Sequence, residues 1–217
     1  MSFGRFIAIE GLDGCGKGTQ IDILRDRIKN DNYWLTAEPT NGAIGKMIRS
    51  EYLSKKVEVR NHLLTDSLFI ADRVEHITGE DGLLDHLNRG YNVISDRYAL
   101  TGVAYMAANM RLNGINSIPD AIRTAIDYNR IATDILMPDL TILIDVDTNT
   151  ALDRINAKHG TDLYENGKFL AIARIMYAEA INELRIIYPD SQFVLVDGSR
   201  SVEEIANNIA TIIGGIA

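Results

Sequence analysis

The sequence predicts an α/β fold in which a five-stranded parallel sheet carries helices on both faces. Two observations support this prediction: short apolar runs alternate with longer segments of helical periodicity, and each run is continuously apolar. Continuous runs are typical of strands that are buried on both faces of a parallel sheet, and parallel strands need crossover helices between them. Ligands of such sheets bind at the carboxyl ends of the strands, so functional residues are expected there. The expected strands are Phe6–Ile9, Tyr33–Thr36, Asn92–Ser95, Leu140–Asp145 and Phe193–Val196.

Length and composition restrict the class of protein. The chain has 217 residues, which fits a single domain, 1–217, and its formal net charge is −8 at pH 7. This acidic balance argues against a protein that coats nucleic acid or an anionic membrane. The single cysteine, Cys15, excludes an intramolecular disulfide, and the uncharged runs are too short to span a bilayer. We therefore expect a cytoplasmic protein with no nucleic-acid partner and no membrane partner.

A glycine-rich loop follows the first expected strand and reads Gly11-Leu12-Asp13-Gly14-Cys15-Gly16-Lys17-Gly18-Thr19-Gln20. The spacing Gly11-x4-Gly16-Lys17 is that of a Walker A phosphate-binding loop, or P-loop. Its glycines let backbone N–H groups converge on an anion, the following helix adds its positive dipole end, and Lys17 neutralises the β and γ phosphates. The loop predicts the P-loop NTPase fold. The expected ATP-binding residues are Gly11, Gly14, Cys15, Gly16, Lys17, Gly18 and Thr19.

Two residues of this loop need separate comment. A strict Walker A loop has Ser or Thr directly after the lysine, where its hydroxyl reaches Mg²⁺, whereas this chain has Gly18 followed by Thr19. The run Gly16–Gln20 resembles the loop of adenylate kinases, which also lack that hydroxyl. A direct protein ligand to Mg²⁺ is therefore not assigned to the loop. Cys15 is either a thiol activated by the helix N-terminus or, as we favour, a small residue that fills a tight loop.

Four further segments follow the loop in the chain. Together with the loop they resemble the thymidylate kinase family, and the resemblance runs from Arg5 to about Glu204. It implies a P-loop monophosphate kinase with a short lid, usually a homodimer, that moves the γ-phosphoryl group of ATP onto dTMP with Mg²⁺. The four segments are Glu38–Arg49, Leu68–Arg73, Asp96–Tyr105 and Pro138–Asp147.

The resemblance assigns roles at the acceptor site. Phe69 and Arg73 are four residues apart and share a helix face. By resemblance, Phe69 stacks on thymine and Arg73 donates to a base carbonyl. From spacing alone, we would favour core packing for Phe69. By resemblance, Tyr105 closes the pocket near the sugar 2′ carbon, although a core tyrosine is nearly as plausible.

Charged residues at strand ends complete the expected site. By resemblance, Arg97 holds the acceptor phosphate and Asp13 contacts the sugar 3′-hydroxyl. Glu38 is expected to help form the pocket and pair with its arginines, with a solvated surface residue as the alternative. Asp96 ends the third strand, where it can organise Mg²⁺-bound water or accept an acceptor-site hydrogen bond. The alternative for Asp96 and Arg97 is a structural pair at a helix start.

A lid is expected to supply further positive charge. An arginine on the transferring phosphoryl group is worth about 10³–10⁵ in rate. By resemblance, this arginine follows the loop aspartate in some members, whereas others have glycine there and place arginines in a lid. Gly14 stands at that position and favours a lid, near 154–168. Arg154 is the expected main lid arginine, with Lys158 assisting; the alternative is that Arg154 faces solvent. The expected catalytic residues are Lys17, Asp96, Arg97 and Arg154.

Two other functions stay open from the sequence. Another nucleoside monophosphate kinase, similar to adenylate kinase, is suggested by the run Gly16–Gln20, and a non-catalytic nucleotide-binding protein by Gly18 and a lid with few basic residues. The last helix adds no function but has a clear start. Ser201 and Glu204 form an expected capping box, and its apolar face is expected to carry Val202, Ile205, Ile209 and Ile212.

Overall fold

The computed structural model describes residues 3–28, 32–54, 62–157 and 166–214. These residues form five parallel strands in the order β2-β3-β1-β4-β5. All five strands lie where the sequence predicts them, and four of the five extend one residue further at one end or at both. The strands are β1 (Phe6–Glu10), β2 (Tyr33–Ala37), β3 (Asn92–Asp96), β4 (Leu140–Asp145) and β5 (Gln192–Asp197).

The register of the sheet brings charged residues together at its carboxyl edge. Asp96, the last residue of β3, pairs with Ile9 of β1 on one side and Ala37 of β2 on the other. Glu10, the last residue of β1, pairs with Leu143 of β4. The segments that leave β1, β2 and β3 therefore begin side by side, which is where an open α/β sheet builds its site.

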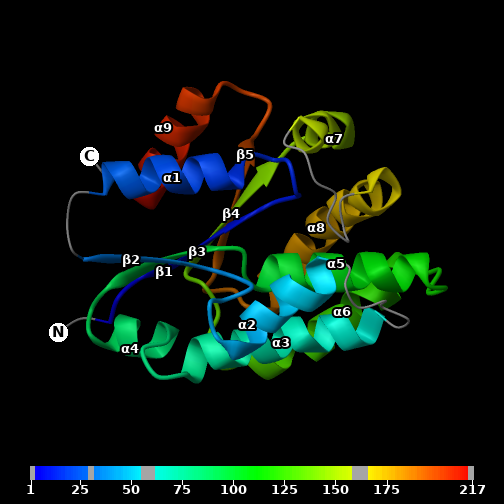
Figure 1. Ribbon diagram of the computed structural model, residues 1–217, viewed down its shortest axis with the longest axis horizontal. Helices are drawn as coiled ribbons and strands as arrows, with labels where there is room; N and C mark the ends of the chain where they lie inside the picture. Colours follow the sequence, from blue (N-terminus) through cyan, green and yellow to red (C-terminus); the bar gives the residue numbers. More distant parts are fainter. Residues whose placement is uncertain (1–2, 29–31, 55–61, 158–165, 215–217) are drawn as a thin grey trace.

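Helices connect the strands and cover both faces of the sheet (Figure 1). The isoleucines and leucines of α1 and α9 pack on one face, and α3, α4 and the start of α5 pack on the other. A second apolar core lies among α5, α6 and α8. The helical segments are α1 (Lys17–Arg27), α2 (Ala43–Met47), the π-helical η1 (Ile48–Leu53), α3 (His62–Thr78), α4 (Leu83–Asn88), α5 (Ala99–Leu112), α6 (Ile118–Thr133), α7 (Thr148–Asn156), α8 (Gly167–Ile187) and α9 (Val202–Ile213).

Helix α9 begins as predicted but buries a slightly different face. The capping box is present, with Ser201 accepting from the Glu204 N–H and the Glu204 side chain accepting from the Ser201 N–H. Val202 is half exposed, at 51%, so its expected place on the apolar face is wrong. Val202 is the first helical residue and lies beyond the edge of the packed surface. Ala206 and Ile213 are buried in its place. Within the described ranges, no helix is both long and apolar enough to cross a bilayer.

Candidate active site

The phosphate loop joins β1 to α1 and lies directly against α7. Gly14 has φ +80°, and a Cβ atom on it would lie 2.3 Å from the Ala151 carbonyl oxygen of α7. A side chain cannot fit there without moving α7, which is the physical reason for glycine at this position. Gly16 has φ +98° and caps α1 in the left-handed conformation. Gly18 and Thr19 follow on the exposed first turn of α1.

Lys17 lies across its own loop. Its Nζ donates to the carbonyl oxygens of Gly11 at 2.8 Å and of Leu12 at 3.0 Å, and the residue is buried. The Sγ atom of Cys15 lies 3.7 Å from the same Nζ, and Cys15 is only 1% exposed. This burial supports the interpretation of Cys15 as a residue that fills the loop. The ammonium group is thus held at the concave side of the phosphate loop.

An ion pair links the phosphate loop to the end of β3. The Arg97 guanidinium donates to Asp13 Oδ1, and Tyr105 of α5 donates to Asp13 Oδ2 at 2.8 Å. Burial alone would raise the pKa of Asp13, but the charges of Arg97 and Lys17 and the Tyr105 hydrogen bond lower it below its usual value. Asp13 is therefore a carboxylate at neutral pH. The structure brings together three residues that the sequence analysis placed at the acceptor site.

The backbone of Arg97 is strained and firmly held. Its φ is +70°, in the left-handed region, which costs a non-glycine residue on the order of 1 kcal/mol. Its N–H donates to the Ile9 carbonyl oxygen at 2.9 Å, and its own carbonyl oxygen accepts from Ser95 Oγ at 2.8 Å. The strained turn directs the guanidinium back over β1, where NH1 lies 3.3 Å from the Gly11 carbonyl oxygen.

Glu10 fixes the segment that follows Arg97. Its carboxylate accepts from the backbone N–H groups of Tyr98, Leu100 and Thr101 at 3.0–3.2 Å, so it caps the N-terminus of α5. Burial raises the pKa of this fully buried carboxyl group above its usual value. The sequence analysis missed Glu10, although a charged residue at the end of a buried strand was an available signal.

A pocket between α3 and α5 contains the expected base-binding residues. Phe69 is partly exposed and lines this pocket, so core packing alone does not describe it. Tyr105 lines the pocket and also packs edge-on against Phe169 of α8, so it belongs both to the pocket wall and to the core. The polar groups on its walls belong to Glu38, Asp66, Arg73, Arg97, Tyr98, Thr101, Tyr105 and Asn129.

Arg73 and Glu38 form a buried pair in this pocket. The Arg73 Nε and NH2 groups donate to Glu38 Oε2 at 2.9 and 2.8 Å, and Glu38 is 6% exposed. The other carboxylate oxygen lies 3.1 Å from His76 Nδ1. Burial alone would lower the pKa of Arg73, but the Glu38 charge raises it above its usual value. Glu38 is thus no solvated surface residue, and its expected pairing with an arginine is present.

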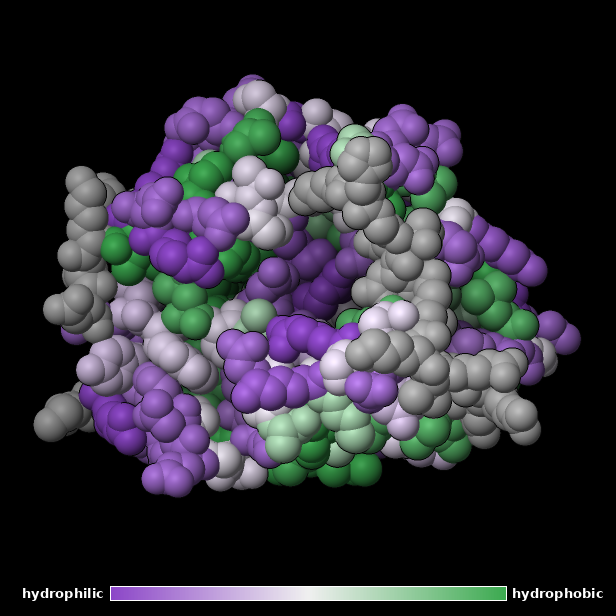
Figure 2. Space-filling model, viewed as in Figure 1, coloured by the Kyte–Doolittle hydropathy of each residue, from purple (hydrophilic) through white to green (hydrophobic). Residues whose placement is uncertain are grey.

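Asp96 has a carboxylate oxygen that no described residue contacts by a hydrogen bond. This oxygen, Oδ1, is fully buried. Asp96 and Gly18 both line a groove beside β2, and the space-filling view shows the molecule hollowed here, with hydrophilic residues at the floor (Figure 2). A Cβ atom on Gly18 would meet nothing within 4 Å. The groove therefore has space at Gly18, and the Asp96 carboxyl group lies in its wall.

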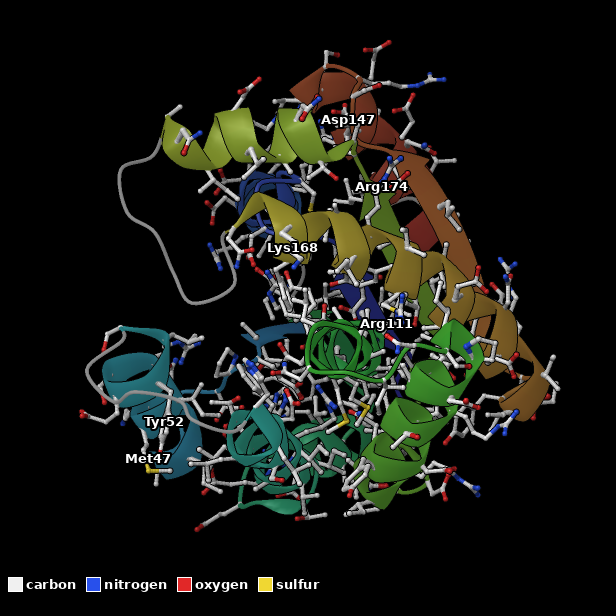
Figure 3. All side chains as sticks on the ribbon, turned by 90° about the vertical axis from the view of Figure 1, so that its right-hand side faces the viewer. Met47, Tyr52, Arg111, Asp147, Lys168 and Arg174 are labelled. Atoms are coloured by element: carbon white, nitrogen blue, oxygen red, sulfur yellow. The ribbon has the colours of Figure 1, made fainter. Side chains whose placement is uncertain are left out.

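Only part of the expected lid is described. Arg154 of α7 donates to the carbonyl oxygens of Cys15 at 3.2 Å and of Gly198 at 3.1 Å. It therefore contacts the phosphate loop and does not merely face solvent. Lys158 lies outside the described residues. Figure 3 shows Lys168 at the start of α8 and Arg174 further along it, where Arg174 forms a bidentate ion pair with Asp145 of β4 at 2.8 Å.

Two polar residues that the sequence analysis did not select also belong to the site. Thr101 lies in the segment after β3 and bridges Glu10 and the Tyr177 hydroxyl; its place four residues after Arg97 was an available signal. Asn129 of α6 accepts from Arg73 NH1 at 2.8 Å. No motif marks Asn129, because only the packing of α6 against α3 and α5 brings it to the pocket.

Fold and site together define a phosphotransferase of the P-loop NTPase class, with a phosphate loop, an arginine at its rim and a neighbouring pocket lined by aromatic and charged residues. The family model described as thymidylate kinase matches residues 9–209 of this chain. The chain therefore belongs to the thymidylate kinase family, whose reaction is the ATP-dependent phosphorylation of dTMP.

Individual relatives agree with this assignment. A probable thymidylate kinase of Methanocaldococcus jannaschii is 38% identical over 205 residues, which cover 94% of this chain and 93% of that protein. A thymidylate kinase of Fervidobacterium nodosum is 31% identical over 210 residues, covering 95% and 97%. The solved thymidylate kinase of Candida albicans has a TM-score of 0.73 at 28% identity, covering 98% of this chain and 92% of its own. The predictions of family, fold class and reaction are confirmed.

Proposed function

We propose that this chain transfers the γ-phosphoryl group of Mg²⁺·ATP to dTMP with Lys17, Arg97 and Arg154 as the residues that neutralise the reacting phosphates. The observation that carries this proposal is the ion pair between Arg97 and Asp13. It joins the phosphate loop to the pocket that contains Phe69, so donor and acceptor phosphates would meet at one place.

The proposed chemistry is a displacement at the γ-phosphorus. An oxygen of the dTMP phosphate forms the new bond, the bond to the β–γ bridging oxygen breaks, and ADP leaves. Both reactants are anions, so positioning and charge neutralisation account for most of the catalysis. Lys17 serves the β and γ phosphates from within the loop, Arg97 offers a planar fork to the acceptor phosphate, and Arg154 approaches the loop from α7.

Asp96 is the residue we propose for the Mg²⁺ site. Its buried Oδ1, which no described residue contacts by a hydrogen bond, fits a role in holding water bound to the metal, because hard cations prefer oxygen ligands and Mg²⁺ usually keeps several waters. When bound, Mg²⁺ would neutralise negative charge on the reacting phosphates. Gly18 offers no hydroxyl ligand, so Asp96 is the candidate protein group at this position.

Recognition of dTMP is proposed to come from α3, α5 and the phosphate loop. Phe69 stacks on thymine, an interaction worth roughly 1–3 kcal/mol, and Arg73 donates to a base carbonyl. The Asp13 carboxylate accepts from the sugar 3′-hydroxyl. Tyr105, held by Asp13, occupies the space near the sugar 2′ carbon and so favours deoxyribose.

We further propose that two copies of the chain associate through α3 and α6. These helices pack against each other and expose large apolar side chains, which is typical of a protein–protein interface. The exposed residues are Leu63, Leu64, Tyr128, Ile131 and Ile135. Sedimentation should give two chains for the wild type and one for Ile131→Glu, and a monomeric wild type would contradict this proposal.

A cytoplasmic location, where ATP and dTMP occur together, completes the proposal.

A coupled assay of ADP release tests the reaction. The protein is given Mg²⁺·ATP and, in separate reactions, dTMP, dUMP, AMP, CMP or GMP. We expect turnover with dTMP well above the others; the missing methyl group of dUMP lowers its rate by only roughly 10–200-fold. Turnover mainly with AMP would instead favour an adenylate-kinase-like enzyme. Saturable dTMP binding without ADP release would favour a non-catalytic nucleotide-binding protein.

A further inference from the structure

The guanidinium of Arg73 is almost fully used by the protein itself. Nε and NH2 donate to Glu38 Oε2, NH2 also donates to the Tyr98 carbonyl oxygen at 2.9 Å, and NH1 donates to Asn129 Oδ1 at 2.8 Å. A guanidinium has five N–H groups, and these bonds employ four of them. Among the described residues, one N–H on NH1 is left to meet a ligand in the pocket.

Asn129 determines which N–H remains. It is 1% exposed, and its Nδ2 donates to the Ala125 carbonyl oxygen at 2.8 Å within α6. This bond fixes the amide so that Oδ1, an acceptor, faces Arg73. A flipped amide would set an N–H donor against another N–H donor and leave both buried groups unsatisfied, at a cost of about 1–3 kcal/mol each.

Gly102 of α5 makes room for this contact. A Cβ atom on Gly102 would lie 2.7 Å from Asn129 Oδ1 and 2.8 Å from Arg73 NH1. Any side chain there would push Asn129 away from Arg73. The glycine is therefore explained by the close approach of α3, α5 and α6 around one hydrogen bond.

We propose that Asn129 is a positioning residue that restricts Arg73 to a single free N–H and thereby selects acceptors with a carbonyl oxygen, and not an amino group, at the base edge facing Arg73. This inference rests on the proposed dTMP kinase function. Arginine can only donate hydrogen bonds, so Arg73 can bind a carbonyl oxygen but not an amino group. An amino group opposite the fixed N–H leaves two donors facing each other in a buried pocket, and a site built for a hydrogen bond rejects such mismatches strongly.

The test compares dTMP with dCMP, which differ at this edge, in wild type, Asn129→Leu and Asn129→Asp. We expect Asn129→Leu to raise the KM for dTMP about tenfold and to leave kcat within about threefold. The ratio of kcat/KM for dTMP to kcat/KM for dCMP should fall at least tenfold, because the guanidinium can then turn away from an amino group. Asn129→Asp keeps the acceptor oxygen and should retain the ratio. Gly102→Ala keeps both Asn129 and Arg73 but forces them apart, so it should have the same kinetic effect as Asn129→Leu. It provides a second test if Asn129→Leu folds poorly.

Thr133→Val is the matched control. Thr133 lies one turn further along α6 and is buried; its hydroxyl contacts the backbone carbonyl oxygen of Asn129 and the Tyr188 hydroxyl, but not the Asn129 side chain or Arg73. Its removal should lower the melting temperature and leave the dTMP-over-dCMP ratio unchanged. An unchanged ratio in folded Asn129→Leu and Gly102→Ala would overturn the inference. A loss of kcat with no change in the ratio would also overturn the inference, since the loss of a merely structural residue has this effect.

Calorimetric binding of dTMP and dCMP separates this inference from the proposed function. A wild type that binds dTMP at least tenfold more tightly than dCMP, with the difference lost in Asn129→Leu, supports the role of Asn129 even without turnover. Absence of ADP release then contradicts the proposed function alone. Equal binding of both nucleotides by the wild type overturns the inference.

Discussion

Single residues carry most of the chemistry of this site, and Arg97 is the clearest example. The left-handed backbone, the N–H bond to β1 and the Asp13 ion pair all act on one side chain. Strain of this kind persists only when the surrounding structure determines it. The position of the guanidinium is therefore set by the end of the sheet before any substrate arrives.

Replacing Arg97 with lysine tests the planar fork. Both residues have a Cβ atom and so bear the same backbone strain, but lysine cannot bind a phosphate in a bidentate manner. We expect kcat/KM for dTMP to fall roughly 10–100-fold, the value of one charged hydrogen bond, while the KM for ATP stays within threefold. Arg111→Lys, at the far end of α5 (Figure 3), is the matched control and should change neither. Equal losses in both variants would contradict the assigned role.

Gly18 offers a second test at the scale of a residue. Because a Cβ atom meets nothing within 4 Å there, serine fits without repacking. We expect Gly18→Ser to lower the Mg²⁺ concentration for half-maximal rate at least threefold relative to Gly18→Ala. Both variants should also unfold at higher temperature, since a non-glycine residue stabilises a helix by about 0.5–1 kcal/mol. An identical Mg²⁺ dependence of the two variants would contradict a role for a hydroxyl at this position.

At the scale of elements, helix α7 packs directly against the phosphate loop. Gly14 packs under Ala151, and Arg154 bonds to two carbonyl oxygens, those of Cys15 in the loop and Gly198 after β5. Helix α7 thus contacts the loop at Gly14 and Cys15, whereas Arg97 contacts it at Gly11 and Asp13. The loop lies between positive groups that come from two different elements.

Arg154→Ala is expected to lower turnover at least tenfold with unchanged dTMP binding, since an arginine on the transferring phosphoryl group acts mainly in the transition state. Single-turnover kinetics and dTMP titration provide the two values. Arg25→Ala, which removes an exposed arginine of α1, should leave both unchanged. A loss of turnover below tenfold, with binding intact, would mean that Arg154 only supports the backbone of the loop.

At the scale of the whole molecule, one buried carboxyl group makes stability depend on pH. Asp66 is 7% exposed at the pocket wall, and its Oδ1 accepts from Asn109. Burial raises the pKa of Asp66 to about 7, and the Asn109 hydrogen bond only partly opposes this. The folded chain therefore keeps a proton that the unfolded chain releases near pH 4. Stability falls as pH rises from about 4 to about 7, and the full loss, at most on the order of 4 kcal/mol, remains above that.

The variant Asp66→Asn should remove the part of this pH dependence that Asp66 contributes. We expect its melting temperature to exceed that of the wild type at pH 8 and the difference to vanish near pH 4, because the protonated carboxyl and the amide are both neutral. Differential scanning calorimetry across this range gives the answer. Asp190→Asn replaces an exposed aspartate and serves as control. A difference that is constant with pH would show that Asp66 is ionised throughout.

How much of this could be predicted from the sequence depends on the range of the interactions involved. Strands, the capping box and the phosphate loop follow from local patterns. Arg97 and Glu38 stand out by their positions next to strand ends, whereas the role expected for Asp13 came only from the resemblance to the family. The contact between Asn129 and Arg73 does not, because three helices distant in sequence must first pack together. Spacing alone also could not distinguish Phe69 as a pocket residue from a core residue, since both lie on the inner face of an amphipathic helix.

The buried thiol inside the phosphate loop has a practical consequence. Cys15 is the chain's single cysteine, so a thiol-selective alkylating reagent modifies only this position. Its Sγ is shielded by the loop and lies beside the ammonium of Lys17. The rate of alkylation therefore measures how often the phosphate loop opens, with no label or engineered mutation. Alkylation is followed as a mass shift at this one residue. Slower alkylation with ATP than with dTMP would show that ATP binds at the phosphate loop and protects Cys15.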